Sequence, residues 1–154
     1  MIIRQVTKED VPNCLDLLKE FQEEALKKYG TNIDPDQILS TVEHYLEYSF
    51  VAEHDGKIVG ILAGQAMKIP AADKPIYHEA VWYVSKAHRR VGIHLLKTLE
   101  QKCRETGIGH IIMAHMYNSM PDALAKFYIR SGYRPFEIHY IKNIKEVENE
   151  VPAT

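Results

Sequence analysis

The sequence predicts an α+β domain, built on one twisted mixed sheet of about six to seven strands with four flanking helices. The expected order of elements is a strand, two helices, three strands and two helix–strand pairs, the last of which ends in one or two strands. A tight hairpin in the first half requires antiparallel pairing, whereas the later strand–helix–strand crossovers favour parallel pairing. At 154 residues, of which 45% are hydrophobic, the chain can bury one core. We therefore expect one domain over residues 1–144 and a polar tail over residues 145–154.

One strand and two helices open the chain. Residues 2–6 can form a short strand, and Thr7 followed by Asp10 is typical of a capping box at a helix start. Apolar residues then recur at helical spacing over residues 11–25, and Asp34-Pro35 predicts the start of a second helix. The apolar stripe of that second helix consists of Ile38, Val42, Tyr45 and Leu46.

A hairpin follows the two helices. Residues 50–53 and 57–69 predict antiparallel strands, because Asp55-Gly56 between them supplies the positive φ angles that a tight turn requires. Gly60 and Gly64 lie inside the second of these strands. Glycines at such positions indicate twisting, a bulge or the close approach of another backbone.

The second half alternates strands with helices. Residues 76–84 are rich in β-branched and aromatic residues and predict a strand. A helix over residues 90–106 follows, with apolar residues every four positions, and residues 110–116 are apolar enough for a buried strand. A capping-box-like start from Ser119 to Asp122 predicts the last helix, and residues 133–144 should supply one or two final strands.

Composition excludes several classes of protein. The formal net charge of −2 and the sequence pI near 6.4 lack the basic excess of a nucleic-acid-binding domain. Cys14 and Cys103 form neither a disulfide framework nor a zinc-ligand spacing, which fits a reducing compartment. The sequence contains neither an apolar signal region at its start nor eighteen uninterrupted apolar residues. We expect a soluble cytoplasmic protein that binds neither nucleic acid nor membranes.

The most informative stretch, Val84 to Leu96, leaves a predicted strand and enters a predicted helix. Backbone N–H groups at a helix start lack intrahelical partners, and the helix dipole adds roughly half a positive charge there. Arg89 and Arg90 add charge-assisted donors. Because Gly92 has no Cβ, the loop backbone can approach an anion closely there. These features predict a binding site for a pyrophosphate.

Two short motifs resemble the GNAT superfamily of N-acetyltransferases. Residues 89–94, Arg-Arg-Val-Gly-Ile-His, resemble its signature Q/R-x-x-G-x-G/A between the fourth strand and the third helix. Residues 123–133 resemble its second signature, a helix that carries A-x-x-x-x-Y and closes in glycine followed by an aromatic residue. His94 departs from the small residue of the first motif, and Pro121 stands where the family often has an asparagine, so that Asn118 is the nearest asparagine.

The resemblance implies an acetyl-CoA-dependent N-acetyltransferase, in which a primary amine attacks the thioester directly in a ternary complex. Val84 then lies near the backbone donor to the thioester oxygen, if a bulge frees that donor from the sheet ladder. His94 implies either a slightly displaced loop or an imidazole that meets the phosphate or pantetheine group. The residues implied for CoA binding are Val84, Arg89, Arg90, Val91, Gly92, Ile93, His94 and Leu95.

The same resemblance implies two catalytic side chains. Glu79 lies close to where several family members keep a glutamate as general base, which removes a proton from the amine directly or through water. Tyr128 matches the tyrosine that protonates the leaving thiolate, since a phenol with a pKa near ~10 is well matched to a thiol near ~8.5. The alternatives are a solvated glutamate on a strand face and a buried aromatic packed beside Leu124.

A metal site is not expected. His110 and His115 are five positions apart on a predicted strand and face opposite sides, while His88 and His94 lie in a loop without nearby carboxylates or cysteines. Cys103 lies on the apolar stripe of a helix and is typical of a core residue, so it is not expected to be a nucleophile.

The sequence leaves open both whether the protein is catalytic and which amine it acetylates. A non-catalytic acyl-CoA sensor and a protein-interaction domain without CoA are the two rival functions. The acceptor is a small-molecule or protein amine, and a homodimer is left open. Acidic residues in the predicted pair of helices are compatible with a cationic amine, although a solvated acidic helix face is the commoner explanation for such residues. They are Glu20, Glu23, Glu24, Asp34, Asp36, Glu43 and Glu47.

Overall fold

The computed structural model describes residues 1–32, 34–37, 44–118 and 120–145. Two compact units make up the chain: Met1–Phe21 with Ile33–Ala114, and Gln22–Asn32 with His115–Thr154. The first unit contains the sheet, and the second contains helix α4 (Pro121–Arg130). One domain over residues 1–144 stays a prediction. Within the described residues, no helix combines the length and apolar character that crossing a bilayer requires.

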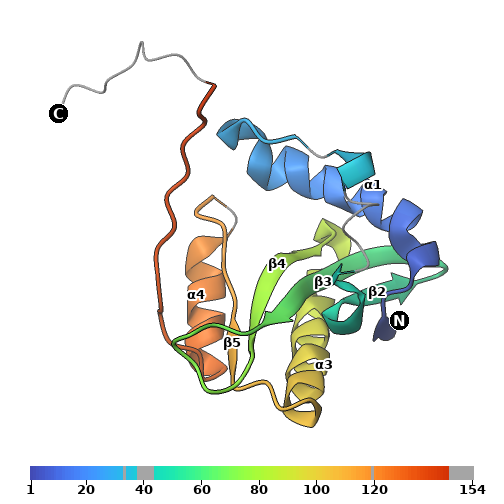
Figure 1. Cartoon of the computed structure of the whole chain (residues 1–154). Helices are drawn as coiled ribbons and strands as arrows, with labels where there is room; N and C mark the ends of the chain where they lie inside the picture. Colours follow the sequence, from blue (N-terminus) through green and yellow to red (C-terminus); the bar gives the residue numbers. More distant parts are fainter. Residues whose placement is uncertain (33, 38–43, 119, 146–154) are drawn as a thin grey trace. The chain divides into compact units, whose positions relative to one another are not determined.

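One mixed sheet forms the centre of the first unit (Figure 1). Neighbouring strands pair antiparallel from β1 to β4, and β5 pairs parallel to β4, as the strand–helix–strand crossover predicts. The five strands lie in chain order across the sheet. They are β1 (Ile2–Gln5), β2 (Phe50–His54), β3 (Lys57–Met67), β4 (Ile76–Val84) and β5 (His110–Ile112).

The predicted hairpin between β2 and β3 is confirmed. Asp55 and Gly56 form its turn with φ angles of 50° and 76°, both in the left-handed region. The predicted strand over residues 76–84 is also confirmed, with the same bounds.

A β-bulge interrupts the pairing of β3 with β4, as the glycines in β3 indicate. Ala63 pairs with Val81 and Gly64 pairs with Glu79, so Ala80 has no partner on β3. The extra residue therefore lies in β4, directly after Glu79, where a bulge bends the strand and redirects its side chains.

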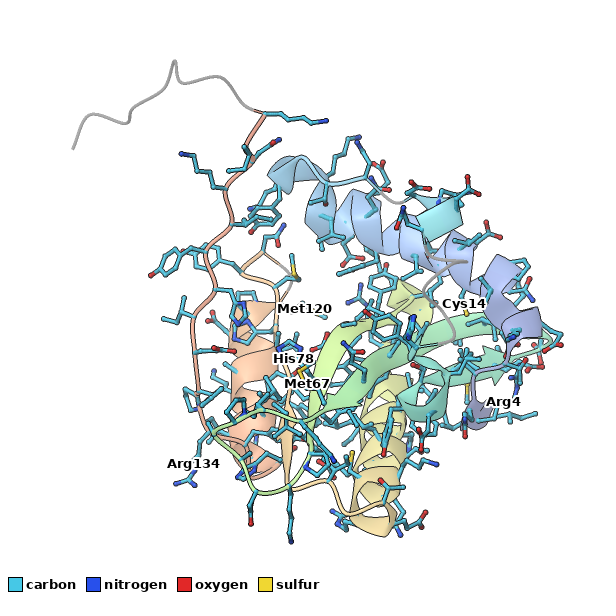
Figure 2. The ribbon with its side chains drawn as sticks, in the orientation of Figure 1. Arg4, Cys14, Met67, His78, Met120 and Arg134 are labelled. Carbon is cyan, nitrogen blue, oxygen red and sulfur yellow. The ribbon has the colours of Figure 1, made fainter. Side chains whose placement is uncertain are left out.

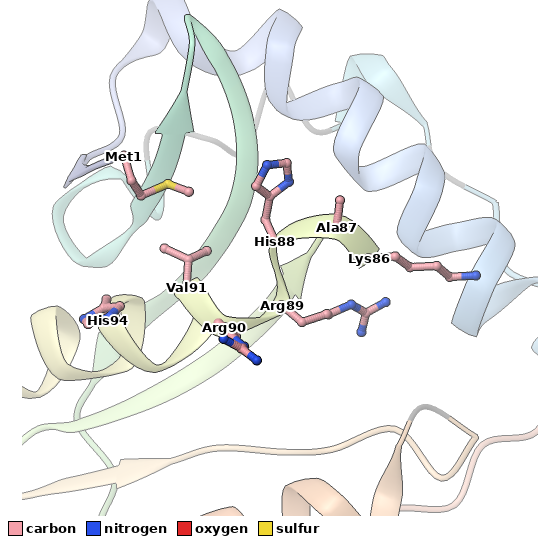
Figure 3. Close-up of a pocket in the computed structure, with 8 residues that line it drawn as sticks. All are labelled: Met1, Lys86, Ala87, His88, Arg89, Arg90, Val91 and His94. Atoms are coloured by element: carbon pink, nitrogen blue, oxygen red, sulfur yellow. The ribbon is translucent and has the colours of Figure 1, made fainter.

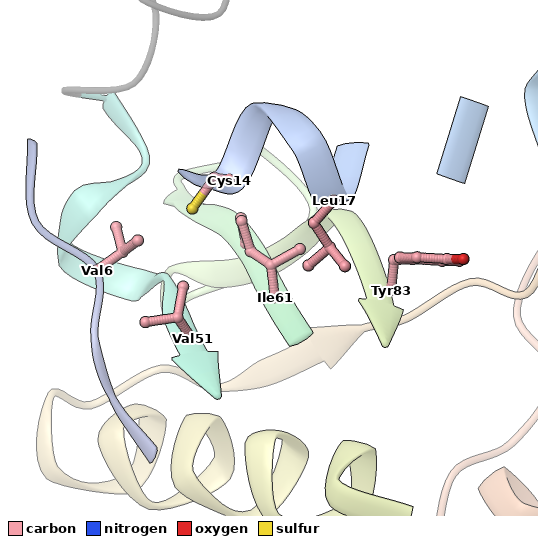
Figure 4. Packing of buried hydrophobic residues seen from close by; sticks show 7 residues of the cluster. Val6, Cys14, Leu17, Val51, Ile61 and Tyr83 are labelled. Carbon is pink, nitrogen blue, oxygen red and sulfur yellow. The ribbon is translucent and has the colours of Figure 1, made fainter. Parts of the chain in front are cut away.

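Helices α1 (Val11–Phe21) and α3 (Gly92–Glu105) cover opposite faces of the sheet (Figure 1). Because side chains alternate along a strand, Ile61 packs toward α1 while Gly60 meets Leu95 of α3. Figure 4 shows the core under α1. It consists of Val6, Cys14, Leu17, Val51, Ile61, Ala63 and Tyr83.

The first helix begins as predicted, and the second lies partly outside the described residues. The Thr7 N–H donates to the Asp10 carboxylate at 2.8 Å, which confirms the capping box. At the second predicted start, the Asp34 carboxylate accepts from the Asp36 N–H at 3.0 Å, and residues 35–37 are helical. Ile38 and Val42 of its predicted stripe fall outside the described residues, while Leu46 begins a short 3-10 helix.

Among the described residues the sheet has five strands, fewer than the six to seven predicted. Strand β5 ends at Ile112 instead of Met116, and residues 133–144 form no strand among the residues that the structure describes. A strand is stable only beside a partner that accepts its hydrogen bonds and covers its apolar face. Residues 133–144 have no such partner strand in the described chain, and Phe136 is 75% exposed. Ser119, predicted to cap α4, is not among the described residues.

Arg4 of β1 (Figure 2) is the centre of an ionic cluster that ties β1 to Asp10, directly before α1, and to Glu53 of β2. The two terminal nitrogens of Arg4 each donate to the Asp10 carboxylate at 2.7 Å, and one also reaches Glu53 at 2.9 Å. Hydrogen bonds from Arg4 lower the pKa of the buried Asp10 to about 2. The pair therefore stabilises the fold while Asp10 is ionised.

Substituting Arg4→Met is expected to lower the free energy of unfolding by about 1–3 kcal/mol at pH 7, because Asp10 loses its partner in a buried position. Since the folded pKa of Asp10 lies below its unfolded value, this loss should shrink as the pH falls from about 4 to about 2. Urea unfolding at both pH values tests this. Lys27→Met is the control, because its pair with Glu23 is exposed, and a loss of equal size in both variants would contradict the prediction.

Candidate active site

The predicted anion loop joins β4 to α3. A 3-10 helix, Lys86–Val91, fills the connection and is kinked at His88, where φ is −124°. The loop borders an open cavity of about 480 Å³ (Figure 3). The cavity is lined by Met1, Lys86, Ala87, His88, Arg89, Arg90, Val91 and His94.

The amides at the start of α3 are only partly free, which corrects the prediction of a fully unpaired helix start. Val91 is the N-cap of α3, so the amides of Gly92, Ile93 and His94 have no i−4 partner. The Gly92 N–H donates to the Arg89 carbonyl, which completes the 3-10 turn. Ile93 and His94 follow in the first turn of α3, where backbone N–H groups are generally available to a ligand. Leu95 is fully buried, so its side chain belongs to the core and does not reach the cavity.

The cavity has a strongly positive lining. Lys86, Arg89 and Arg90 all line it, and neither an aspartate nor a glutamate does so among the described residues. Arg89 is half-buried, with its guanidinium carbon 5.3 Å from the centre of the Tyr83 ring. This ring fixes Arg89 through a cation–π contact, while Arg90 is exposed. A protein wall that carries only positive charges favours the binding of an anion.

The backbone at the end of β4 has a donor that faces away from β3. The Ser85 N–H donates to the Val59 carbonyl at 2.9 Å, and N–H groups alternate between the two edges of a strand. The Val84 N–H therefore points to the other edge of β4. The ladder of β4 with β5 covers only Ile76 to His78, so no described strand pairs with Val84 on that edge. This geometry fits the expected donor to a thioester oxygen.

Glu79 lies on β4 beside the bulge. Its carboxylate accepts a hydrogen bond from the Ala114 N–H at 2.8 Å. Although part of the side chain is still accessible to solvent, the surrounding protein raises the pKa of Glu79 to about 7, mainly by burial. A fully solvated glutamate on a strand face does not describe this residue. A carboxyl group with a pKa near neutrality suits a general base.

Tyr128 belongs to the second unit, on helix α4, and only 8% of its surface is exposed. Its ring lies 5.4 Å from the Tyr133 ring and 6.5 Å from the His115 ring, measured between centroids. Both predicted interpretations, a proton donor and a packed aromatic residue, agree with this placement.

A comparison of the sequence with models of protein families shows the family of this chain. The model of the Acetyltransferase (GNAT) family matches residues 13–133, most of the chain. The chain belongs to the GNAT acetyltransferase family. The match spans both motifs, the loop at the start of α3 and helix α4.

Solved structures share the fold of this GNAT protein. An aminoglycoside acetyltransferase from an uncultured soil metagenomic sample has a TM-score of 0.72 and 18% identity, covering 94% of this chain and 96% of that chain. Ribosomal-protein-alanine N-acetyltransferase from Brucella melitensis biovar Abortus 2308 has a TM-score of 0.73 and 16% identity, covering 94% of this chain and 100% of that chain. Aminoglycoside N-acetyltransferase AAC(6')-Iy in complex with CoA has a TM-score of 0.64 and 19% identity, covering 92% of this chain and 99% of that chain. A search of curated proteins finds no match.

The structure of this GNAT protein gives contacts to two residues, Asn118 and His88, to which the sequence assigned no role. The Asn118 side-chain amide donates to the Ala25 carbonyl at 3.1 Å, inside the second unit. In the first unit, His88 Nδ1 lies 3.1 Å from Ser85 Oγ, on the wall of the loop cavity. The three-residue spacing of Ser85 and His88 was the available signal, but it is common in turns.

The described residues contain no group of three or more His, Cys, Asp or Glu side chains arranged to hold a metal ion. Burial raises the pKa of the Cys103 thiol to about 11, which keeps it protonated and unreactive.

Proposed function

We propose that this protein is an N-acetyltransferase that moves the acetyl group of acetyl-CoA to a primary amine, by direct attack in a ternary complex. The observation that carries the proposal is the cavity at the start of α3, which is lined by three fixed cations and by no described carboxylate. The diphosphate of CoA is an anion that fits such a site.

The residues at the loop fit acetyl-CoA by charge and by donor type. Lys86 and Arg90 and the amides of Ile93 and His94 would hold the diphosphate. Bound there, acetyl-CoA supplies an activated acyl group as a thioester. The Val84 N–H would donate to the oxygen of that thioester, where negative charge develops during attack.

Glu79 and Tyr128 would move the protons. An alkylamine with a pKa near ~10.4 must lose a proton before it attacks, at a cost of about 4.6 kcal/mol at pH 7. Glu79 would accept this proton in its ionised form. Glu79 precedes Val84 by five residues, roughly 16 Å along a strand, which favours transfer through ordered water. Tyr128 would give its phenolic proton to the leaving thiolate.

The acceptor is proposed only as a primary amine, on a small molecule or on a protein. The similar structures are described as acting on aminoglycosides and on a ribosomal-protein alanine, which represent both kinds of acceptor. Their low identity to this chain supports no choice between them.

An amine panel with acetyl-CoA tests the proposal. We expect release of free thiol with at least one of a polyamine, an aminoglycoside, an amino acid or a peptide amine. We also expect acetyl-CoA to raise the unfolding temperature of the protein. A thermal shift without thiol release would favour a non-catalytic acyl-CoA sensor. The absence of any shift would contradict the cofactor site itself.

Substituting Tyr128→Phe is expected to lower kcat by about 10²-fold, because the phenolic proton is lost while the ring still packs. Thiol release at saturating acetyl-CoA measures the effect. Tyr133→Phe is the matched control, since its ring lies in the same aromatic group, and it should keep wild-type turnover. Equal rates in all three proteins would show that Tyr128 only packs.

A further inference from the structure

Two histidines face the loop cavity together with its fixed cations. His88 and His94 both line the cavity, and His94 stands where the family signature has a small residue. The proposed function uses neither imidazole, since it employs only the backbone amide of His94. The following inference rests on that proposed function.

His88 is held in place on both sides. Its Nδ1 lies 3.1 Å from Ser85 Oγ, and its ring centre lies 5.1 Å from the ring centre of His54 on β2. His54 in turn has its Nε2 3.4 Å from the Asp55 carboxylate, which is 89% exposed. The serine contact occupies Nδ1 of His88 and leaves Nε2 as the second nitrogen for a ligand.

His94 lies in the first turn of α3 and is exposed. It lines the loop cavity and also a second cavity of about 700 Å³ between α3 and β1. Lys97 and Lys102 of α3, Glu105 at the end of α3 and Met1 before β1 line this second cavity as well. Because His94 lies in the first turn of α3, it is close to the helix N-terminus, where the helix dipole favours an anion.

Positive charges border the two imidazoles in the loop cavity. Lys86, Arg89 and Arg90 border the same cavity, as does Met1. Asp55 near His54 and Glu105 near Lys102 are the carboxylates at the margins, and neither lines the loop cavity. A bound diphosphate would add negative charge there, and a nearby anion favours the charged form of an imidazole.

We infer that His88 and His94 are side-chain ligands of the CoA diphosphate in their protonated form, so that cofactor binding takes up protons. The charge of a histidine changes between about pH 5 and pH 8. Because binding favours the charged form, its contribution to affinity is complete at low pH and is lost as the pH rises. This chain thus uses His94, the bulky residue at the position of a small one in the family signature, as a further anion ligand.

Calorimetric titration of the full chain with 3′-dephospho-CoA tests the inference. This ligand keeps the diphosphate but lacks the phosphate monoester, whose own titration near pH 6 would add protons. Titrations in buffers of different ionisation enthalpy count the protons taken up. For the wild type we expect roughly half a proton or more per ligand at pH 7, and a Kd that weakens by roughly tenfold between pH 6 and pH 8.5.

The variants separate the histidines from other titrating groups. His94→Asn and the double variant that also carries His88→Asn should take up fewer protons and show a flatter pH dependence of Kd. At pH 6 we expect both variants to bind roughly three- to tenfold more weakly than the wild type. Glu79, with a pKa of about 7, titrates in the same range but is unchanged in these variants. His110→Asn on β5 is the matched control and should behave as the wild type.

The outcomes distinguish this inference from the proposed function. Binding with the same proton count and pH dependence in wild type and variants would overturn the role of the histidines and leave the transferase proposal standing. No binding by the wild type at either pH would overturn both. Because His94 is exposed, its single variant is expected to fold even if the double variant does not.

Discussion

Glu79→Gln is expected to lower kcat by about 10²- to 10⁴-fold, the usual contribution of a general base. Glutamine keeps the size of the side chain and can still accept the hydrogen bond from the Ala114 N–H, but it cannot take the proton of the amine. The wild-type rate should rise with pH as Glu79 ionises, with a midpoint at about 7. Thiol release measured from pH 5.5 to 9 should show this limb in the wild type and lose it in the variant.

Loss of stability would not explain that result. Burial raises the folded pKa of Glu79 above its unfolded value, so ionisation of Glu79 destabilises the fold as the pH rises from about 4.5 to 7. The glutamine variant removes this cost and should unfold no more easily than the wild type at pH 8. Glu9→Gln, at an exposed position, is the control. Full turnover of Glu79→Gln with an unchanged pH profile would refute the role of Glu79.

Gly64→Ala is expected to lower the free energy of unfolding by about 3 kcal/mol, at the upper end for an overpacked core. A Cβ at Gly64 would overlap the His78 carbonyl oxygen and would lie 2.5 Å from the hydroxyl oxygen of Tyr77. Neither group can move cheaply, because one is strand backbone and Tyr77 is fully buried. Urea unfolding at pH 7 measures the loss.

Gly92→Ala is the matched control for Gly64→Ala. A Cβ at Gly92 would meet Trp82 at 3.4 Å, an ordinary contact, and Gly92 already has helical φ and ψ angles. Its stability should therefore change by less than about 1 kcal/mol. Equal stability of Gly64→Ala and the wild type would mean that β3 and β4 do not pack as closely beside the bulge as described.

The parts of the fold that the sequence predicts correctly depend on local chemistry. Asp55-Gly56 fits few conformations other than a tight turn, so the hairpin follows from two residues. The capping box at Thr7 and Asp10 is equally local. The loop at the start of α3 follows from the same logic, because a strand, a basic pair and a helix start occur in one short stretch.

Other features depend on contacts between distant residues and could not be predicted. The glycines of β3 indicate a bulge, but its place at Ala80 follows from the register of β3 with β4, in which Gly64 lies beside Tyr77 and the His78 carbonyl. The bond from the Gly92 N–H to the Arg89 carbonyl is local, but the sequence does not distinguish the 3-10 turn that contains it from a direct helix start. The apolar alternation of residues 133–144 is compatible with a strand, but alternation does not provide the partner that a strand needs.

The central claim is that the loop at the start of α3 binds the diphosphate of CoA. A crystal structure of the protein with CoA tests it most directly. We predict the diphosphate at the amides of Ile93 and His94, with Arg90 and Lys86 beside it. Clear density for CoA elsewhere on the protein, with this loop unoccupied, would contradict the account.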